Sequence, residues 1–161
     1  MRLRLRYVYV GFLVAYLVIL GLPSVLPVVS EAEKASNVVE NNARIASVSV
    51  SGIFGNNLLI CVLSALPFFG VGFLGAVIWQ TGVIGASYAS VGLAVYFNPF
   101  VWVEVPVYAF MALTSCLIYL RLFKRDWRGA WGLFLRGVGV SVVVMLISAF
   151  VEFLLVKGVS L

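Results

Sequence analysis

Two glutamates in otherwise apolar stretches are the strongest candidates for chemistry in this sequence. Glu104 is the one charged side chain between Val83 and Leu120, and Glu152 lies near the end of the last apolar run. A carboxylate inside a bilayer costs roughly 2.5–3.5 kcal/mol on insertion scales, so it needs a partner, a proton or a purpose. Two carboxylates in one low-dielectric site cannot both ionise easily. A pair at one site would therefore share a proton or a cation.

Other catalytic equipment is missing from the sequence. It has no histidine, which is the commonest proton shuttle and metal ligand. Its two cysteines, Cys61 and Cys116, lie in separate apolar runs and are interpreted as small buried residues. We find no Gly-rich phosphate loop, no Walker motif and no Ser or Cys nucleophile beside a base. The sequence therefore predicts no enzyme activity, no cofactor and no bound metal.

The composition indicates a protein whose solvent is the lipid bilayer. Of 161 residues, 63% are hydrophobic and 11% are charged, and the mean hydropathy is +1.14. A water-soluble domain of this size cannot hide so much apolar surface. The net charge of +5 sits in short blocks beside apolar runs, which marks membrane orientation and argues against nucleic-acid binding. We predict an all-α polytopic membrane helical bundle, one domain over residues 1–161.

Five apolar runs predict about five transmembrane helices. A span needs about 20 apolar residues. The predicted spans are residues 7–29, 53–79, 82–97, 100–120 and 129–156. A secretory signal peptide is the alternative for the first run, but that run exceeds the usual apolar region of such peptides. After it, Ser30 and Glu33 form a capping-box pattern that predicts a polar surface helix over about 31–50.

Small residues and prolines predict how these spans pack and bend. A four-residue repeat of small side chains predicts close helix packing in the third span, at Gly82, Ala86, Ser90 and Ala94. In the second span the same packing role falls to Gly70, Gly72 and Gly75. Proline removes a backbone donor, so helix kinks are expected at Pro67, Pro99 and Pro106.

Charge distribution predicts the orientation in the cell membrane. The N-terminus and the 121–128 loop are basic, so both should face the cytoplasm, and five spans then place the C-terminus outside. Glu104 and Glu152 would each lie about 6 Å below the outer boundary, at 1.5 Å per residue. We expect one polar intramembrane cluster at this depth, formed by Glu104, Glu152, Asn56, Asn57 and Asn98. Arg44, on the outer segment, is a candidate charge above it.

An ordered set of motifs resembles the stage II sporulation protein M family of membrane proteins. The motifs are Ile53-Phe54-Gly55-Asn56-Asn57, Thr81-Gly82-Val83-Ile84-Gly85, Pro99 five residues before Glu104, and Ser148-Ala149-Phe150-Val151-Glu152. The family pattern is Phe-x-Asn-Asn, Asn-Gly-x-x-x-Gly, Pro-His-Gly-x-x-Glu and Ala-Ala-x-x-Glu. Thr81, Phe100 and Val101 depart from its Asn, His and Gly. The resemblance runs from about residue 50 onward and implies a five-span membrane subunit.

Two functions from different classes follow. The leading hypothesis is a non-enzymatic integral membrane subunit or scaffold of a membrane protein complex, which contacts other membrane proteins or copies of itself. The alternative is a small transporter or permease component that uses Glu104 and Glu152 to carry protons or cations. An accessory subunit of an ATP-driven exporter is a third possibility of the subunit kind.

Overall fold

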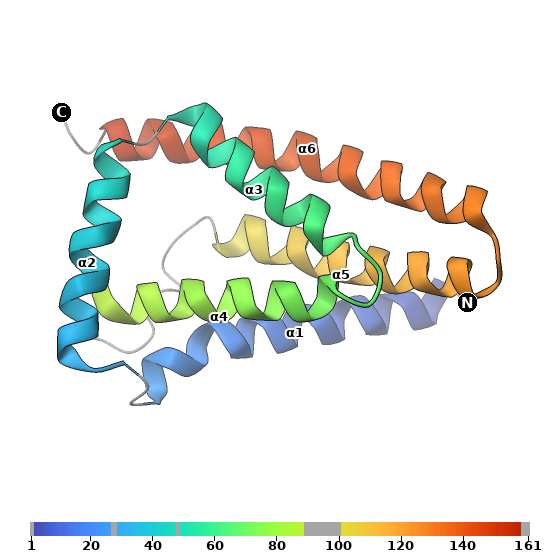
Figure 1. Cartoon of the computed structure of the whole chain (residues 1–161), viewed down its shortest axis with the longest axis horizontal. Coiled ribbons are helices and arrows are strands. Elements are labelled where there is room, and N and C mark those ends of the chain that lie inside the picture. The colour runs from blue at the N-terminus through green and yellow to red at the C-terminus, as the bar shows by residue number, and fades with distance from the viewer. Residues whose placement is uncertain (1, 27–28, 48, 89–100, 159–161) are drawn as a thin grey trace.

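The chain is a bundle of helices with one helix lying across its end. The computed structural model describes residues 2–26, 29–47, 49–88 and 101–158. Those residues form six helices and no strand: α1 (Arg2–Val25), α2 (Glu31–Ala46), α3 (Val50–Ser64), α4 (Gly70–Tyr88), α5 (Val101–Phe123) and α6 (Trp127–Gly158). Figure 1 shows α2 across one end, which we call the α2 end. The opposite end, which holds the N-terminus and the turn from α5 to α6, is the basic end. The all-α prediction is confirmed.

Four of the described helices are long and apolar enough to cross a membrane. They contribute the candidate spans Arg4–Val25, Gly70–Tyr88, Val101–Phe123 and Trp127–Leu154. α3 is also apolar but has only 15 residues, which is about 22 Å of helix at 1.5 Å per residue. These lengths and compositions are those of a multi-pass membrane protein.

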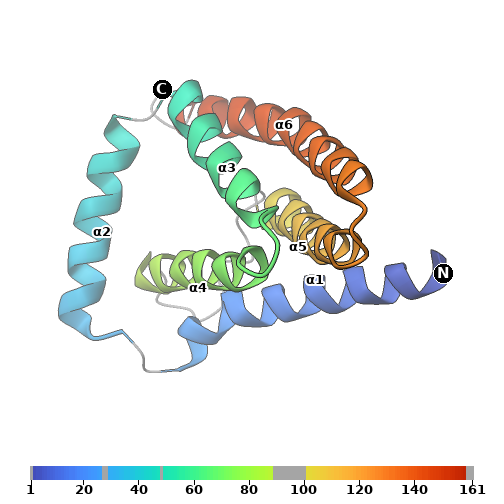
Figure 2. The same cartoon turned by 45° about the vertical axis from the view of Figure 1, so that its right-hand side comes forward.

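The predicted continuous span over 53–79 is wrong. The helix ends at Ser64, and residues 65–69 form a turn from which α4 runs back toward the α2 end, so α3 and α4 make a helical hairpin (Figures 1 and 2). Pro67 does not kink a helix but lies in this turn, because it lacks a backbone donor and restricts the residue before it. Phe68 in the same turn has a φ of 68°.

The predicted end of one span at 79 and start of the next at 82 are also wrong. Residues 79–82 lie inside α4 and do not form a turn. Thr81 Oγ1 donates to the Val77 carbonyl oxygen at 3.0 Å, so the hydroxyl is satisfied within the helix. Gly82 is buried against α1, and an added Cβ there would lie 2.3 Å from the Leu20 carbonyl oxygen. The glycine in this position allows close helix approach and does not form a turn.

The hairpin turn packs against the C-terminal half of α5. Ser115 Oγ donates to the Leu66 carbonyl oxygen at 2.8 Å, and the rings of Phe68 and Tyr119 meet edge to face with centroids 4.4 Å apart. Tyr119 precedes the last residue of α5, Phe123, by about 6 Å of helix. The hairpin therefore stops short of the basic end, as Figure 1 shows.

Only part of the predicted small-residue packing occurs within the chain. Gly82 and Ala86 are buried, and Gly70 has no room for a side chain because a Cβ would lie 1.9 Å from the Ser64 carbonyl oxygen. A Cβ at Gly72 or Gly75 would meet nothing within 4 Å, so these two glycines do not bring described helices together. Ser90, Ala94 and Pro99 lie outside the described residues.

α5 is the centre of the bundle, and α1 is part of the bundle. Ten α5 residues are buried, and the helix continues through Pro106. Tyr16 and Leu20 of α1 are 2% and 1% exposed. Tyr9 and Tyr16 of the same helix donate from their hydroxyls to the Pro106 and Val71 carbonyl oxygens at 3.4 and 3.3 Å. The first helix is thus held by both packing and hydrogen bonds.

α2 has the polar character and the N-terminal cap that the sequence predicts. The backbone N–H of Ser30 donates to Glu33 Oε2 at 2.8 Å, and the backbone N–H of Glu33 donates to Ser30 Oγ at 3.3 Å. This is a complete capping box. The helix ends at Ala46, and α3 begins after an N-cap at Ser49 that accepts from the Gly52 N–H.

Candidate functional site

A hydrogen bond between α3 and α5 is the centre of the candidate site. Asn57 Nδ2 donates to Glu104 Oε1 at 2.8 Å. The Asn57 side chain comes from the middle of the hairpin's first arm, and Glu104 from the first turn of α5. Asn57 is buried, at 7% exposure, while Glu104 is half-buried. This hydrogen bond joins residues 47 positions apart in the chain and ties the hairpin to α5.

The other predicted members of the polar cluster are only partly gathered here. Glu152, half-buried on α6, lies within electrostatic range of Glu104. Asn56 is exposed and touches the cluster through a long contact of 3.5 Å from its Nδ2 to Asn57 Oδ1. Asn98 lies outside the described residues, and so does the side chain of Arg44. The described cluster is therefore an Asn57–Glu104 pair with Glu152 nearby.

From this pair toward the basic end, further polar side chains lie along the interface of α3, α5 and α6. Tyr108, one turn after Glu104, is 5% exposed and lies within electrostatic range of Glu104, Glu152 and Cys61. The Cys61 thiol, fully buried on α3, lies beside the Ser141 hydroxyl of α6. The hydroxyl oxygens of Ser141 and Ser148 are buried and have no hydrogen-bond partner within the described residues. We call these residues, together with Asn57, Glu104 and Glu152, the polar column.

The polar column contains four residues that the sequence prediction missed: Cys61, Tyr108, Ser141 and Ser148. A signal for them exists in the spacing. Asn57 and Cys61 are four residues apart, as are Glu104 and Tyr108, and Ser141, Ser148 and Glu152 are separated by seven and four. Steps of four and seven place side chains on one face of a helix. One polar stripe on each of three apolar helices predicts that the stripes face each other.

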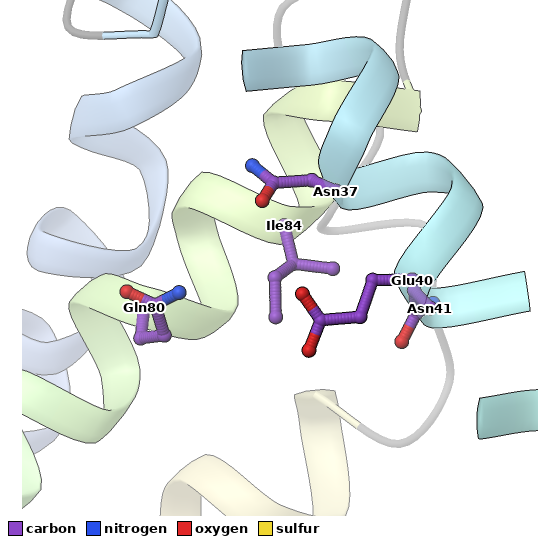
Figure 3. A pocket seen from close by; sticks show the side chains of 5 residues that line it. All are labelled: Asn37, Glu40, Asn41, Gln80 and Ile84. Atoms are coloured by element: carbon purple, nitrogen blue, oxygen red, sulfur yellow. The ribbon is translucent and has the colours of Figure 1, made fainter. Parts of the chain in front are cut away.

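A second polar region lies between α2 and α4, at the α2 end. Figure 3 shows a cavity of about 190 Å³ whose lining side chains are Asn37, Glu40 and Asn41 of α2 and Gln80 and Ile84 of α4. A neighbouring cavity of about 240 Å³ shares Asn37 and Gln80 with it. The cavities therefore adjoin beneath α2.

Asparagine side chains hold α2 onto α4 around these cavities. Asn37 Nδ2 donates to Ser87 Oγ at 3.1 Å, and Asn41 Nδ2 donates to the Tyr88 hydroxyl oxygen at 2.9 Å. The Tyr88 hydroxyl in turn donates to the α2 backbone or to Asn42, at 3.3 and 3.0 Å. These are neutral hydrogen bonds near the surface, and they support a role in positioning α2.

Among the described residues, the site offers carboxylates, amides, hydroxyls and one buried thiol, that of Cys61. In the part of the chain that the structure describes, no three His, Cys, Asp or Glu side chains gather in a way that could hold a metal ion. Cys61 and Cys116 are free thiols. Glu104 and Glu152 are therefore the groups of the polar column best suited to bind a proton or a cation.

Comparison with known proteins adds no relative. No protein-family model matches the chain, and no curated protein or solved structure matches it. The resemblance to the stage II sporulation protein M family thus rests on the motifs alone.

Proposed function

We propose that this chain is a non-enzymatic integral membrane subunit of a larger membrane protein complex. One observation carries the proposal: the outward face of α6 combines an unpaired cation with small residues. Arg136 is exposed on α6, and Gly132 and Gly139 lie four residues before and three after it. A Cβ at either glycine would meet nothing within 4 Å. No acidic side chain among the described residues forms an ion pair with Arg136.

This face has the properties of an interface between membrane helices. Glycines on a membrane helix allow a second helix to approach closely. Arg136 lies nine residues after the first residue of α6, about 13 Å along the helix. A guanidinium on a membrane helix is costly unless it reaches the headgroup region or an acidic or polar group meets it. A partner helix with a carboxylate or an amide opposite Arg136 would use the glycines and satisfy the charge together.

Other features agree with a subunit in the cell membrane. A Cβ at Gly72 or Gly75 of α4 would likewise meet nothing within 4 Å in the described parts of the chain, which leaves a second surface for a partner. The basic residues of the basic end favour a cytoplasmic N-terminus, and the helix order supports a C-terminus on the outer side. The motif resemblance to stage II sporulation protein M-like proteins also implies a subunit.

Native electrophoresis in a mild detergent tests the assembly directly. We expect the wild-type protein to migrate as a complex, either with other membrane proteins or with copies of itself. Gly139→Leu and Arg136→Gln should shift it toward the monomer. The matched control is Gly11→Leu, because Gly11 is an exposed glycine of α1 with equally open surroundings. A wild-type monomer in every mild detergent, or equal behaviour of Gly139→Leu and Gly11→Leu, would contradict the proposal.

The polar column favours one second candidate, a small transporter or permease component. Glu104 and Glu152 lie within electrostatic range of each other in a bundle that contains a hairpin beginning and ending at the same end. Carboxylates within membrane bundles mark proton and ion routes. Interrupted helices around such groups occur in transporters, because the ends of the broken helices can meet an ion.

Flux through proteoliposomes separates the two candidates. A carrier should lose proton or cation flux in Glu104→Gln and Glu152→Gln and keep it in Glu33→Gln, which changes an exposed acid of α2. A subunit without transport activity should show no flux above empty liposomes. Its Glu104→Gln variant should differ from wild type only in stability.

A further inference from the structure

An apolar groove opens at the basic end of the bundle. It lies between the hairpin turn and the corner where α5 meets α6, and its volume is about 440 Å³. Its walls are Leu66 and Pro67 of the turn, Ile118 and Leu122 of α5, and Trp131 and Phe134 of α6. The groove exists because the hairpin reverses before it reaches the end of α5 (Figure 1). Among the side chains that the structure describes, none of α1 contributes to its lining.

Positive charge lies close in the chain to the groove residues. Lys124, Arg125 and Arg128, which we call the basic loop, are exposed, and each lies within two residues of Leu122 or Trp127 of the groove. Asp126 is the one acid in this segment, and its Oδ2 forms an ion pair with Arg121 at 2.6 Å. None of the three basic-loop residues forms an ion pair in the described parts of the chain.

One of these charges occupies a position that usually belongs to glycine. Arg125 has a φ of 58°, in the left-handed region. Its N–H donates to the Leu122 carbonyl oxygen, and the Asp126 N–H donates to that of Arg121, both at 2.9 Å. This is the hydrogen-bond pattern of a helix C-terminus at which glycine is preferred. An arginine therefore occupies a position whose backbone conformation favours glycine.

We propose that the groove binds an anionic phospholipid. One acyl chain lies between the hairpin turn and α6, and the phosphate is held by the basic loop. Guanidinium groups bind phosphate with paired, charge-assisted hydrogen bonds. Basic clusters directly beside a membrane helix attract anionic headgroups, and tryptophans such as Trp127 and Trp131 suit the headgroup level.

The groove chemistry favours a lipid over a protein segment. Its lining offers almost no polar surface. An extended peptide there would leave backbone N–H and C=O groups without partners, which is costly in the hydrocarbon region. A helix is about 10 Å across and would fill the groove within roughly one turn. A flexible acyl chain has no backbone N–H or C=O groups to satisfy, and it fits an apolar groove of about 440 Å³.

Quenching of a single tryptophan by brominated lipids tests the site. Replacing Trp79, Trp102 and Trp127 by Phe leaves Trp131, whose side chain lines the groove, as the only indole. The protein is reconstituted in phosphatidylcholine with equal fractions of dibrominated phosphatidylglycerol or dibrominated phosphatidylcholine. We expect stronger quenching by the brominated phosphatidylglycerol. Its advantage should fall by about five-fold for each basic-loop charge removed.

Two variants and one control distinguish binding at the basic loop from general attraction by surface charge. Lys124→Gln with Arg128→Gln removes two charges from the basic loop. Arg125→Gly removes one charge and introduces glycine, which favours this left-handed backbone conformation. This variant therefore remains informative if the double variant does not fold. Arg4→Gln with Arg6→Gln removes two charges at the same end, from a helix that does not line the groove. The control should keep the wild-type preference.

Three results would overturn the proposal. Equal quenching by the two brominated lipids means that lipid enters without headgroup selection. No quenching by either lipid means that the groove is filled by protein. An equal loss of preference in the control and in the basic-loop variants means that general surface charge, and not this site, attracts the anionic lipid.

Discussion

Asn57 Nδ2 lies 2.8 Å from Glu104 Oε1, and this hydrogen bond joins two residues that are 47 positions apart in the chain. Asn57 lies in α3, which is too short to cross a bilayer comfortably, and Glu104 lies in the first turn of the central helix. A carboxylate that is costly in the membrane is here the anchor of the hairpin. The same contact makes the hairpin's position sensitive to the chemistry of one acid.

Asn57→Leu should destabilise the fold by about 1–3 kcal/mol, because it removes the buried donor to Glu104 and leaves the half-buried carboxyl group without this partner. Glu104→Gln should have a smaller effect, since the amide oxygen still accepts from Asn57. The measurement is the free energy of unfolding in lipid nanodiscs. Asn56→Leu is the matched control, because Asn56 is exposed and makes only a 3.5 Å contact. Equal losses at positions 56 and 57 would show that the hydrogen bond is not what stabilises this region.

Gly70→Ala should open the hairpin. The added Cβ would lie 1.9 Å from the Ser64 carbonyl oxygen and 3.0 Å from Ser115 Oγ, so the turn has to move away from α5. We expect a loss of several kcal/mol, by analogy with the overpacking of well-packed cores, which costs about 1–3 kcal/mol or more. Gly72→Ala is the control, because its Cβ would meet nothing within 4 Å. A Gly72→Ala protein as unstable as Gly70→Ala would refute the steric explanation.

Arg125→Gly should stabilise the α5–α6 connection while it weakens anionic lipid binding. A left-handed backbone conformation costs a non-glycine residue roughly 1–2 kcal/mol, and Arg125 has a φ of 58°. Unfolding in neutral detergent measures the stability gain, since no anionic lipid is then present. Arg128→Gln removes a charge from the same loop without a change of this backbone strain. A lower stability of Arg125→Gly would argue that the arginine side chain itself supports the turn.

Acidification should weaken the N-terminal cap of α6. The Gly129 N–H, at 2.8 Å, and then the Arg121 guanidinium donate to Asp126 and hold the pKa of that carboxyl below its usual value. Because the folded pKa lies below the unfolded one, the contribution is present above the unfolded pKa, about 3.9. It is lost as the pH falls through the folded pKa.

Thermal unfolding between pH 7 and pH 3 checks this pH dependence. The stability advantage of the wild type over Asp126→Asn should shrink as the pH falls, because protonation removes the charge that the variant already lacks. Other acids titrate equally in both proteins and cancel in the comparison. An advantage that stays constant over this range would contradict the assignment.

The general architecture follows from the sequence because it depends on composition and length. Apolar runs, basic flanks and the Ser30–Glu33 capping pattern suffice for the membrane class, for three of the four long helices (α1, α5 and α6) and for the start of α2. The link between Asn57 and Glu104 was also within reach, since costly polar groups at one depth have reason to meet. The rest of the polar column needed the observation that its members recur on one face of each helix.

The hairpin could not be located in the same way because its turn is as apolar as a span. Residues 65–69 contain leucine, proline and two phenylalanines, with no polar signal of a loop. By contrast, Gln80-Thr81-Gly82 looks like a turn but is helical, since Thr81 bonds to its own helix and Gly82 packs against Leu20. Tertiary packing decides both places, and hydropathy does not record it.

The hairpin does not change the side of the membrane from which the later helices start. Its arms run in opposite directions, so it contributes either two crossings or none, and an even number in each case. Whether the turn reaches deeply or only partway into the membrane, α5 and α6 therefore keep the same sides. Insertions or deletions that lengthen or shorten both arms together can therefore accumulate through evolution without inverting the helices that follow.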